Sequence, residues 1–455
     1  MIIDNKEIRI NRENAFISEA DEIYHELIMT ILNEGQRTNN RTGINTISIP
    51  GWSTGLDKKF HVGKSFPILE TKDVKIKNAA SEIQWIHQVQ SNEVKWLQDR
   101  GNHTWDLWAV DDDGIYRVYE QGENAIYNPE REVALQEKVK NPINGVIELI
   151  PMLDEFGKEI MVKSKDLMEG KSNPRTIKEA IWFGKEYAGK IGDVYGGSTC
   201  ETKAPQRVEY TLKHNPTDRR MIINLWNDEK LTKAVLPSCV WSSEYKVTPD
   251  GQLHSFVHQR SADVPLGLPF NISQYALLLS MFAKASGFEV GTMSWSIMDA
   301  HIYVNQLEGI KKQVRRYEYM KEYSDIIQKA SDEELELIYK KNDELFNKIH
   351  EYAKNKTNID LDNLKVSKRI NELKKVDFSL AKDYEEAYER KISYEHMLTR
   401  ENPELELADH DSIFDYSTEY VDKNDPYLKE NPIGNKELVL KKYKPTPFIS
   451  MPIAQ

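Results

Sequence analysis

Hydrophobic and polar positions alternate in several stretches of this chain, and the alternation predicts strands. Residues 46–49 read Thr-Ile-Ser-Ile, the pattern of a half-buried strand. Two longer alternating runs lie between Ser243 and Arg260 and flank Pro249-Asp250-Gly251, which is typical of a hairpin turn. We therefore expect a hairpin here, with Arg260 at the end of a strand.

Two other stretches have apolar residues at helical spacing. Residues 79–89 carry them at Ile83, Ile86 and Val89. A longer series begins after Pro269 and stops at Gly287, a common helix terminator. Its apolar members are Ile272, Tyr275, Ala276, Leu279 and Phe282. This series predicts a buried helix that opens beside Asn271.

The segment of about 316–435 is rich in Lys, Glu, Asp and Tyr. Its apolar residues form the stripe of amphipathic helices. The stripe comprises Ile326, Ile327, Leu335, Ile338, Leu345 and Ile349. We interpret the segment as a mainly helical appendage packed on the core, and the alternative is a surface that binds a partner.

Composition narrows the class of protein. A chain of 455 residues with 39% hydrophobic content can bury a sizeable globular core. Its two cysteines, Cys200 and Cys239, are too few for a disulfide framework, and no apolar run suits membrane targeting or spanning. We therefore expect a cytoplasmic protein without a membrane partner. The formal net charge of -12 argues against broad affinity for nucleic acid, although a few arginines can still hold a small phosphate.

The chemically most informative stretch is 236–271. It offers a reactive sulfur at Cys239, a fixed cation at Arg260 and a carboxamide at Asn271. Cysteine attacks as the thiolate, and a nearby guanidinium both favours the thiolate and suits a phosphate. The pattern predicts sulfur attack on an anionic substrate.

This stretch resembles the thymidylate synthase family. The family's Leu-Pro-x-Cys segment is matched at 236–239, its Gln-Arg-Ser-x-Asp segment at 259–263 and its Leu-Gly-x-Pro-Phe-Asn-Ile segment at 266–272. Further matches follow in order: Arg41-Thr42-Gly43, Phe66-Pro67, Thr71-Lys72, Glu82, Trp105-Asp106-Leu107-Trp108, Val194-Tyr195-Gly196, Asp218-Arg219-Arg220, Asp299-Ala300-His301-Ile302-Tyr303 and a tail from Tyr443 through Ala454. So many ordered matches are far more specific than any single motif.

The resemblance implies an α/β (α+β) protein with the thymidylate synthase fold, a mixed sheet with packed helices. It further implies one catalytic domain over 1–455, working as a homodimer. Two segments look inserted, at about 110–185 and at about 316–435. The first begins with Asp111-Asp112-Asp113-Gly114, which we interpret as a solvated turn because the later ligands of a calcium loop are missing. No metal site is expected.

The resemblance also implies catalytic roles. Cys239 adds to carbon 6 of dUMP, which makes carbon 5 a nucleophile toward the one-carbon unit of 5,10-methylenetetrahydrofolate. Glu82 and Tyr195 serve the proton transfers at the base. Arg260 and Asp263 complete the catalytic group, whereas Cys200 has no assigned role.

Ligand-binding roles follow in the same way. The dUMP phosphate is assigned to Arg41, Arg260 and Ser261, with Arg219 and Arg220 from the partner subunit. Asn271 pairs with the uracil edge and Gln259 belongs to the same substrate group, while His301 and Tyr303 reach the sugar hydroxyl. The folate walls are assigned to Trp105, Trp108, Asp263, Leu266, Gly267, Phe270 and Ala454, where aromatic faces can stack on the folate rings.

Several positions depart from the family. Val240 stands where a histidine is usual, Glu244 where a glutamine is usual, Ile297-Met298 where two glycines are usual, Gln306 where a histidine is usual, and Gln455 where the family ends on an aliphatic residue. Val240 removes a polar contact near the uracil carbonyl. We expect the others near the closing tail or the cofactor, where they bear on the fate of the transferred carbon.

Two products therefore stay open. Hydride transfer from the folate gives dTMP and dihydrofolate, which is the favoured outcome. Addition of water gives 5-hydroxymethyl-dUMP and tetrahydrofolate, as in a hydroxymethylase relative associated with phages that carry modified bases, and the compartment is then the host cytoplasm. An inactive nucleotide-binding or RNA-binding relative is disfavoured by the intact Cys239, Arg260 and Asn271, and by the acidic charge.

Overall fold

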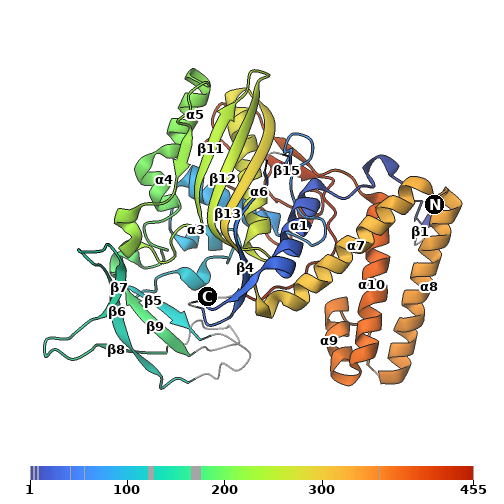
Figure 1. Cartoon of the computed structure of the whole chain (residues 1–455), viewed down its shortest axis with the longest axis horizontal. Coiled ribbons are helices and arrows are strands. Elements are labelled where there is room, and N and C mark those ends of the chain that lie inside the picture. The colour runs from blue at the N-terminus through green and yellow to red at the C-terminus, as the bar shows by residue number, and fades with distance from the viewer. Residues whose placement is uncertain are drawn as a thin grey trace.

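The computed structural model describes residues 2–3, 6–7, 10–40, 42–55, 57–120, 128–164, 176–357 and 359–453. A six-stranded sheet in the order β10-β11-β12-β13-β4-β3 forms its centre (Figure 1). These strands are β3 (Gln36–Thr38), β4 (Thr46–Ser53), β10 (Ile222–Asn224), β11 (Val240–Val247), β12 (Gln252–Asp263) and β13 (Glu289–Tyr303). β12 and β13 are parallel and the other neighbours are antiparallel, so the sheet is mixed, as expected.

The predicted hairpin and buried helix are both confirmed. β11 and β12 are antiparallel neighbours joined at a turn in which the Gly251 N–H donates to the Thr248 carbonyl over 2.9 Å. β12 continues to Asp263, so Arg260 lies inside the strand and not at its end. Helix α6 (Gly267–Ser286) then makes the long crossover that two parallel strands require, and Gly287 ends it at a φ of 76°.

Smaller helices complete the main core. They are α1 (Glu19–Glu34), α2 (Ile76–Gln84), α3 (Val94–Gln98), α4 (Gly196–Thr202) and α5 (Ala204–His214). The helical pattern predicted for 79–89 continues past α2 as one wider π turn, Trp85–Val89. Apolar residues of these helices share one cluster with the inner face of the sheet. Glu82 is thereby carried into the interior.

The opposite face of the sheet is left open. Trp241 and Phe256 are each 38% exposed and Met298 is 65% exposed, whereas their strand neighbours Val257 and Ile297 are buried. Successive strand residues point to opposite faces, so the exposed side chains lie on the side away from α6. This open apolar face has no covering element among the described residues.

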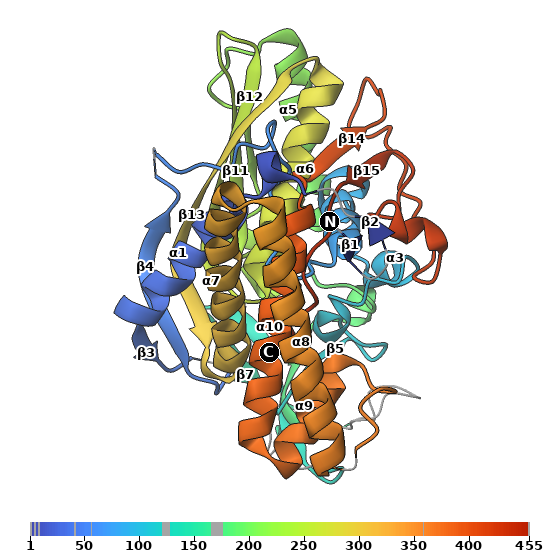
Figure 2. The ribbon, with the colours of Figure 1, turned by 90° about the vertical axis from the view of Figure 1, so that its right-hand side faces the viewer.

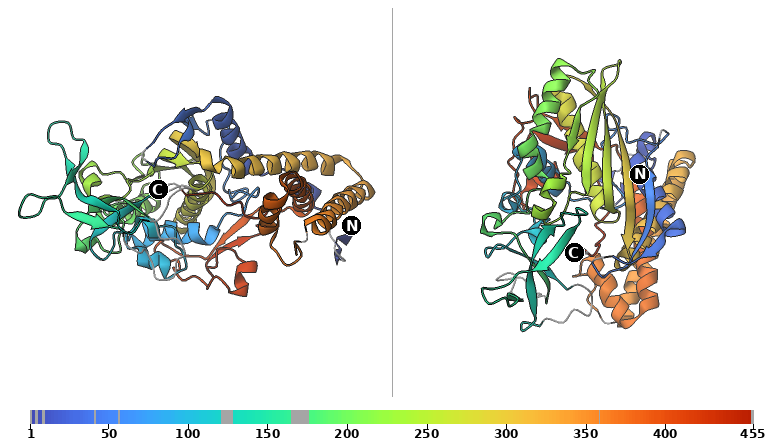
Figure 3. Two further views of the ribbon diagram at one scale, coloured as in Figure 1. Left: turned by 90° about the horizontal axis from the view of Figure 1, so that it is seen from below. Right: turned by 60° about the vertical axis from the view of Figure 1, so that its left-hand side comes forward.

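The segment between Val110 and Gly189 forms a separate sheet, seen at one end of the molecule in Figure 3. Its strands are β5 (Ile115–Tyr119), β6 (Glu132–Lys140), β7 (Ile147–Pro151), β8 (Met161–Lys163) and β9 (Ile177–Trp182). The expected turn at Asp111–Gly114 is present, with Gly114 N–H donating to the Asp111 carbonyl over 2.9 Å. The two ends of the segment are bonded together: Val110 N–H donates to Lys190 O (2.9 Å) and Gly189 N–H to Val110 O (2.8 Å).

Four long helices project from the other end of the molecule (Figure 2). They are α7 (Leu307–Lys329), α8 (Asp332–Thr357), α9 (Val366–Val376) and α10 (Phe378–Thr399). Ile327 and Leu335 of the predicted stripe are fully buried among them. The segment is mainly helical, as predicted, but its helices end at Thr399. Residues 400–441 are mostly irregular and contain the strand pair β14 (Glu404–Leu407) and β15 (Leu438–Lys441). A further short pair is β1 (Ile2–Ile3) with β2 (Lys6–Glu7).

Within the described ranges, none of the helices combines the length and the apolar character needed to cross a bilayer.

Candidate active site

Cys239 lies just before β11, with its sulfur beside a guanidinium from the next strand. Arg260 Nη2 is 3.6 Å from Cys239 Sγ and donates to the Pro237 carbonyl over 2.6 Å, while Arg260 Nε donates to the Ser238 carbonyl over 3.0 Å. The arginine is thus fixed by the backbone of the cysteine loop. The sulfur is half-buried and lies within donor reach of this guanidinium.

Tyr195 contacts the backbone of Cys239. Its hydroxyl oxygen accepts the Cys239 N–H over 2.9 Å, and burial, followed by the nearby Cys239, raises the pKa of the phenol well above its usual value. Tyr195 has a φ of 49°, a conformation that costs on the order of 1–3 kcal/mol in a residue with a side chain. At Gly196 a Cβ would lie 1.8 Å from the Ser91 carbonyl oxygen, so only glycine fits after this tyrosine.

Glu82 is buried near the same tyrosine. Burial raises the pKa of its carboxyl to about 7, and the Trp105 indole and the Gln274 amide partly oppose that effect. Neither of these two donors reaches the geometry of a formed hydrogen bond, so both stay unpaired close to the carboxyl. A carboxyl that titrates near neutral pH suits proton transfer in both directions.

A relay of amides orients Asn271, the predicted base ligand. Trp295 Nε1 donates to Gln259 Oε1 (3.1 Å), Gln259 Nε2 donates to Asn271 Oδ1 (3.2 Å), and Asn271 Nδ2 donates to Gln274 Oε1 (3.0 Å). An indole can only donate, so Trp295 fixes the direction of every amide that follows. Asn271 keeps one acceptor and one donor position for a ligand.

Asp263 lies at the end of β12, where the C-terminal tail comes in. Gln306 Nε2 donates to Asp263 Oδ2 and to the Pro452 carbonyl, both over 3.0 Å, and is fully buried. Burial raises the pKa of Asp263, and it lowers the pKa of the nearby Lys72 to about 8. Lys72 donates to the Pro265 carbonyl. Asp263, Gln306 and Lys72 therefore form a polar cluster beside the tail, here called the Asp263 wall.

The predicted sugar ligands are neighbours. The His301 and Tyr303 rings lie 5.1 Å apart, and His301 Nδ1 is 3.4 Å from Asp299 Oδ2, without a formed hydrogen bond. The imidazole lowers the pKa of Asp299. Ser261, a predicted phosphate ligand, donates to the same Asp299 carboxylate over 3.1 Å.

Other predicted residues are not brought to Cys239. Arg219 and Arg220 are exposed, and Arg220 pairs with Asp218 of its own loop over 2.7 Å. This loop precedes β10, whose Ile222 pairs with Glu244, five residues along the chain from Cys239. Arg41 and Ala454 lie outside the described residues.

The predicted folate residues differ in how deeply they are buried. Trp105 is only 7% exposed and packs against Tyr195 at 5.3 Å and against Trp108 at 5.6 Å between ring centroids. Trp108, Leu266 and Phe270 are half-buried on the edge of the core. Gly267 opens α6, where a Cβ would meet Asn271 Oδ1 only at an ordinary 4.0 Å.

The departures from the family are dispersed. Gln306 does lie at the tail, as expected, and Val240 is buried next to Cys239. The expectation was wrong for Glu244 and Met298, because both are exposed and strand alternation places them on the open face of the sheet. Gln455 lies outside the described residues.

Three residues of the site had no role predicted from the sequence. Gln274 and Trp295 belong to the amide relay, and Lys72, though within a matched motif, had no assigned role. Gln274 follows Asn271 by three positions on a helix, so helical spacing is a signal that could have found it. Trp295 reaches Gln259 across a parallel strand pair, which no local pattern reveals.

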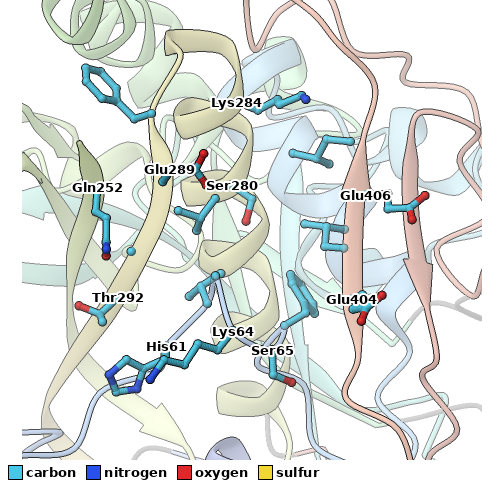
Figure 4. Close-up of a pocket in the computed structure, with 18 of the residues that line it drawn as sticks. His61, Lys64, Ser65, Gln252, Ser280, Lys284, Glu289, Thr292, Glu404 and Glu406 are labelled. Carbon is cyan, nitrogen blue, oxygen red and sulfur yellow. The ribbon is translucent and has the colours of Figure 1, made fainter. Parts of the chain in front are cut away.

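A cavity of about 810 Å³ lies elsewhere, between β13, α6 and β14 (Figure 4). Its walls contain none of the predicted site residues. Several of its charged side chains already have partners, including Lys284 with Asp409 (2.5 Å) and Glu404 with Lys442 (2.6 Å). We therefore assign the chemistry to the Cys239 region.

Comparisons with known proteins identify the family of the chain. A solved structure, thermostable thymidylate synthase A from Bacillus subtilis, is 25% identical and matches 65% of this chain and 84% of that one, with a TM-score of 0.45. Thymidylate synthase from Leuconostoc mesenteroides is 31% identical over 312 residues, which are 66% of this chain and 87% of that enzyme. The sequence model of the thymidylate synthase family matches residues 22–395. By this family match and the homologous enzyme, the chain belongs to the thymidylate synthase family, whose members are one-carbon transferases that act on dUMP with a methylenetetrahydrofolate co-substrate.

Proposed function

We propose that this protein transfers the methylene carbon of 5,10-methylenetetrahydrofolate to carbon 5 of dUMP through a covalent adduct at Cys239, and releases dTMP and dihydrofolate. The observation that carries the proposal is the position of Arg260, whose guanidinium is fixed by the Pro237 and Ser238 carbonyls and faces the Cys239 sulfur. It can donate to the attacking sulfur and also offer its remaining donors to a substrate phosphate.

The proposed reaction proceeds in several steps, and the residues of the site take part as follows. The Cys239 sulfur bonds to carbon 6 of uracil, and the electron pair released at carbon 5 attacks the methylene carbon of the folate. Glu82 and Tyr195, both buried, serve the loss of the carbon 5 proton. Elimination of the folate leaves an exocyclic methylene, hydride from the folate converts it to a methyl group, and the sulfur departs.

The Asp263 wall favours hydride over water at that last step. Gln306 bonds at once to Asp263 and to the Pro452 carbonyl, which holds the tail on the core. A site that excludes water protects a reactive methylene from hydration. This is the reason to prefer dTMP over 5-hydroxymethyl-dUMP.

We also propose a single catalytic domain with two inserted segments, acting as a homodimer through the open apolar face of the sheet. Trp241, Phe256 and Met298 expose apolar area there, and such area usually marks an interface. Arg219 and Arg220 do not contact their own Cys239 loop in the described contacts, which supports a role across the dimer.

The test follows dihydrofolate by absorbance and weighs the nucleotide product by mass spectrometry. Equal amounts of dTMP and dihydrofolate are expected. A product one oxygen heavier than dTMP, formed without dihydrofolate, would overturn the methylation step and establish a hydroxymethylase. If neither nucleotide product forms and 5-fluoro-dUMP gives no covalent adduct, the proposal that the protein is an enzyme is overturned.

A further inference from the structure

We propose that Glu389, on helix α10 of the projecting helices, is a positioning residue for folate binding. It holds Arg316, and Arg316 holds both the root of the C-terminal tail and the Thr71-Lys72 loop. The inference rests on the proposed function, because it takes the tail and the Lys72 loop as walls of the folate site. It gives the projecting helices, which carry none of the predicted site residues, a part in the reaction.

Arg316 is the centre of this arrangement. The residue is 1% exposed, and Nη1 donates to Thr71 O (2.6 Å), Thr446 Oγ1 (2.9 Å) and Pro447 O (2.8 Å). One guanidinium thus joins helix α7 to two segments that are far apart in the sequence. A planar fork of donors suits such a junction, because its directions are fixed relative to one another.

Glu389 supplies the charge that keeps Arg316 in place. Its carboxylate accepts from Arg316 Nε (2.7 Å) and Nη2 (3.2 Å), and both side chains are 1% exposed. Burial opposes ionisation of Glu389, yet Arg316 and Lys312 still hold its pKa below the usual range. A buried cation that loses its counter-charge is strongly destabilised, so Arg316 should move or recruit water when Glu389 is neutral.

Helix α10 also touches the tail root through a second residue. The His396 ring lies 3.0 Å from the Lys444 carbonyl oxygen, and the Thr446 N–H donates to the Glu70 carbonyl over 2.9 Å. Residues 444–447 are therefore bonded to α10 and to the loop that precedes Lys72.

The far end of the tail reaches the Asp263 wall. Gly309 of α7 leaves room for Met451, since a Cβ there would lie 2.5 Å from the Met451 sulfur. Pro452 then accepts from Gln306, which also holds Asp263. On the other route, Thr71 precedes Lys72, which donates to Pro265 two residues beyond Asp263. Both segments held by Arg316 end at the same wall.

The experiment compares Glu389→Gln with Glu386→Gln. Glu386 lies on the same helix and contacts Tyr319 of α7 (3.3 Å), so its variant tests helix packing without the Arg316 junction. We expect Glu389→Gln to raise KM for methylenetetrahydrofolate about tenfold and to leave KM for dUMP within about twofold, because the nucleotide contacts lie elsewhere. Glu386→Gln should change neither value. A folded Glu389→Gln variant with unchanged folate KM, or with an equal rise in both KM values, overturns the proposal.

If Glu389→Gln does not fold, the variant Thr446→Val tests the same link between Arg316 and the tail. It removes the hydroxyl that accepts from Arg316 and keeps the shape of the side chain. The same selective rise in folate KM is expected, and an unchanged value overturns the link.

Hydrogen exchange separates this inference from the proposed reaction. In the free protein, amides of peptides covering 443–453 should exchange at least about tenfold faster in Glu389→Gln than in Glu386→Gln, because the tail root is released. Faster exchange in a protein that does not use folate keeps the structural link and refutes its catalytic meaning. Equal exchange in both variants refutes the link whatever the reaction is.

Discussion

At the scale of single residues, the two cysteines show that the neighbours of a sulfur determine whether it suits a nucleophilic role. Cys239 has a guanidinium at 3.6 Å and a backbone N–H held by Tyr195, whereas Cys200 is exposed on α4 with no comparable neighbour. Sequence alone ranked Cys239 first because of the motif around it. The contact with Arg260 now gives the physical reason.

Cys239→Ser should therefore remove turnover and retain dUMP binding. A serine hydroxyl is not ionised near neutral pH, so the carbon 6 adduct should not form and activity should fall to about 1% or less. Steady-state rates and calorimetric titration with dUMP measure the two effects. Cys200→Ser is the control and should keep full activity; more than a few per cent activity in Cys239→Ser would contradict the nucleophile assignment.

Glu82 predicts a pH dependence. Burial raises the pKa of its carboxyl from the ordinary 4.5 to about 7, so the rate profile should show an ionisation near pH 7 that is missing in Glu82→Gln. For stability the sign is opposite to that of a salt-bridged acid: a raised folded-state pKa means that stability falls as pH rises from about 4.5 and levels off above about 7. Thermal unfolding at pH 5 and pH 8 should show a smaller loss for Glu82→Gln than for the unmodified protein. An equal loss in both would exclude Glu82 as the titrating group.

At the scale of elements, β12, β13 and α6 act together, because their register brings Gln259, Trp295 and Asn271 into one relay. Alternation and helical spacing predicted the hairpin and α6 from local pattern. They could not predict that β12 runs on to Asp263, or that β13 lies parallel to it, because strand pairing is set by contacts distant in sequence. The same reason explains the missed Trp295. The end of the helices at Thr399 could not be predicted for a different reason. The polar composition of residues 400–441 is shared by exposed helices and irregular segments.

The relay makes a specific prediction about base selection. Trp295→Phe keeps an aromatic side chain, although a smaller one, and removes the N–H that fixes Gln259, so Asn271 should sample the flipped orientation that complements cytosine. Preference for dUMP over dCMP should fall about tenfold, or about 1.4 kcal/mol. Competitive binding of the two nucleotides measures it. Trp85→Phe, which truncates another fully buried indole whose N–H donates to the Glu93 carbonyl over 3.1 Å, is the matched control. Unchanged preference in Trp295→Phe would show that the relay does not set the base.

At the scale of the whole molecule, the open sheet face and the exposed arginine loop are the two features that support the proposed homodimer. Each observation alone has an ordinary explanation, since exposed apolar and basic side chains are common. Together they support the proposal that Arg219 and Arg220 act on the site of the partner subunit.

Complementation tests this arrangement. A mixture of Cys239→Ser with Arg219→Ala/Arg220→Ala should regain about a quarter of the unmodified activity per site, because subunit exchange creates one site with its own sulfur and its partner's arginines. Either variant alone should be nearly inactive. If mass measurement shows mixed dimers and the mixture stays inactive, the arginines do not act in trans.

The hydrogen bonds between Val110 and residues 189–190 have one more consequence. They join the two ends of the intervening sheet, so the path between these ends can change in length without separating them. Replacing that path by a short turn would lower the entropy cost of closing the loop by roughly 2 kcal/mol, set against the apolar contacts that are lost. A lineage can therefore gain, enlarge or discard this piece at a single point in the gene without rethreading the sheet that carries Cys239.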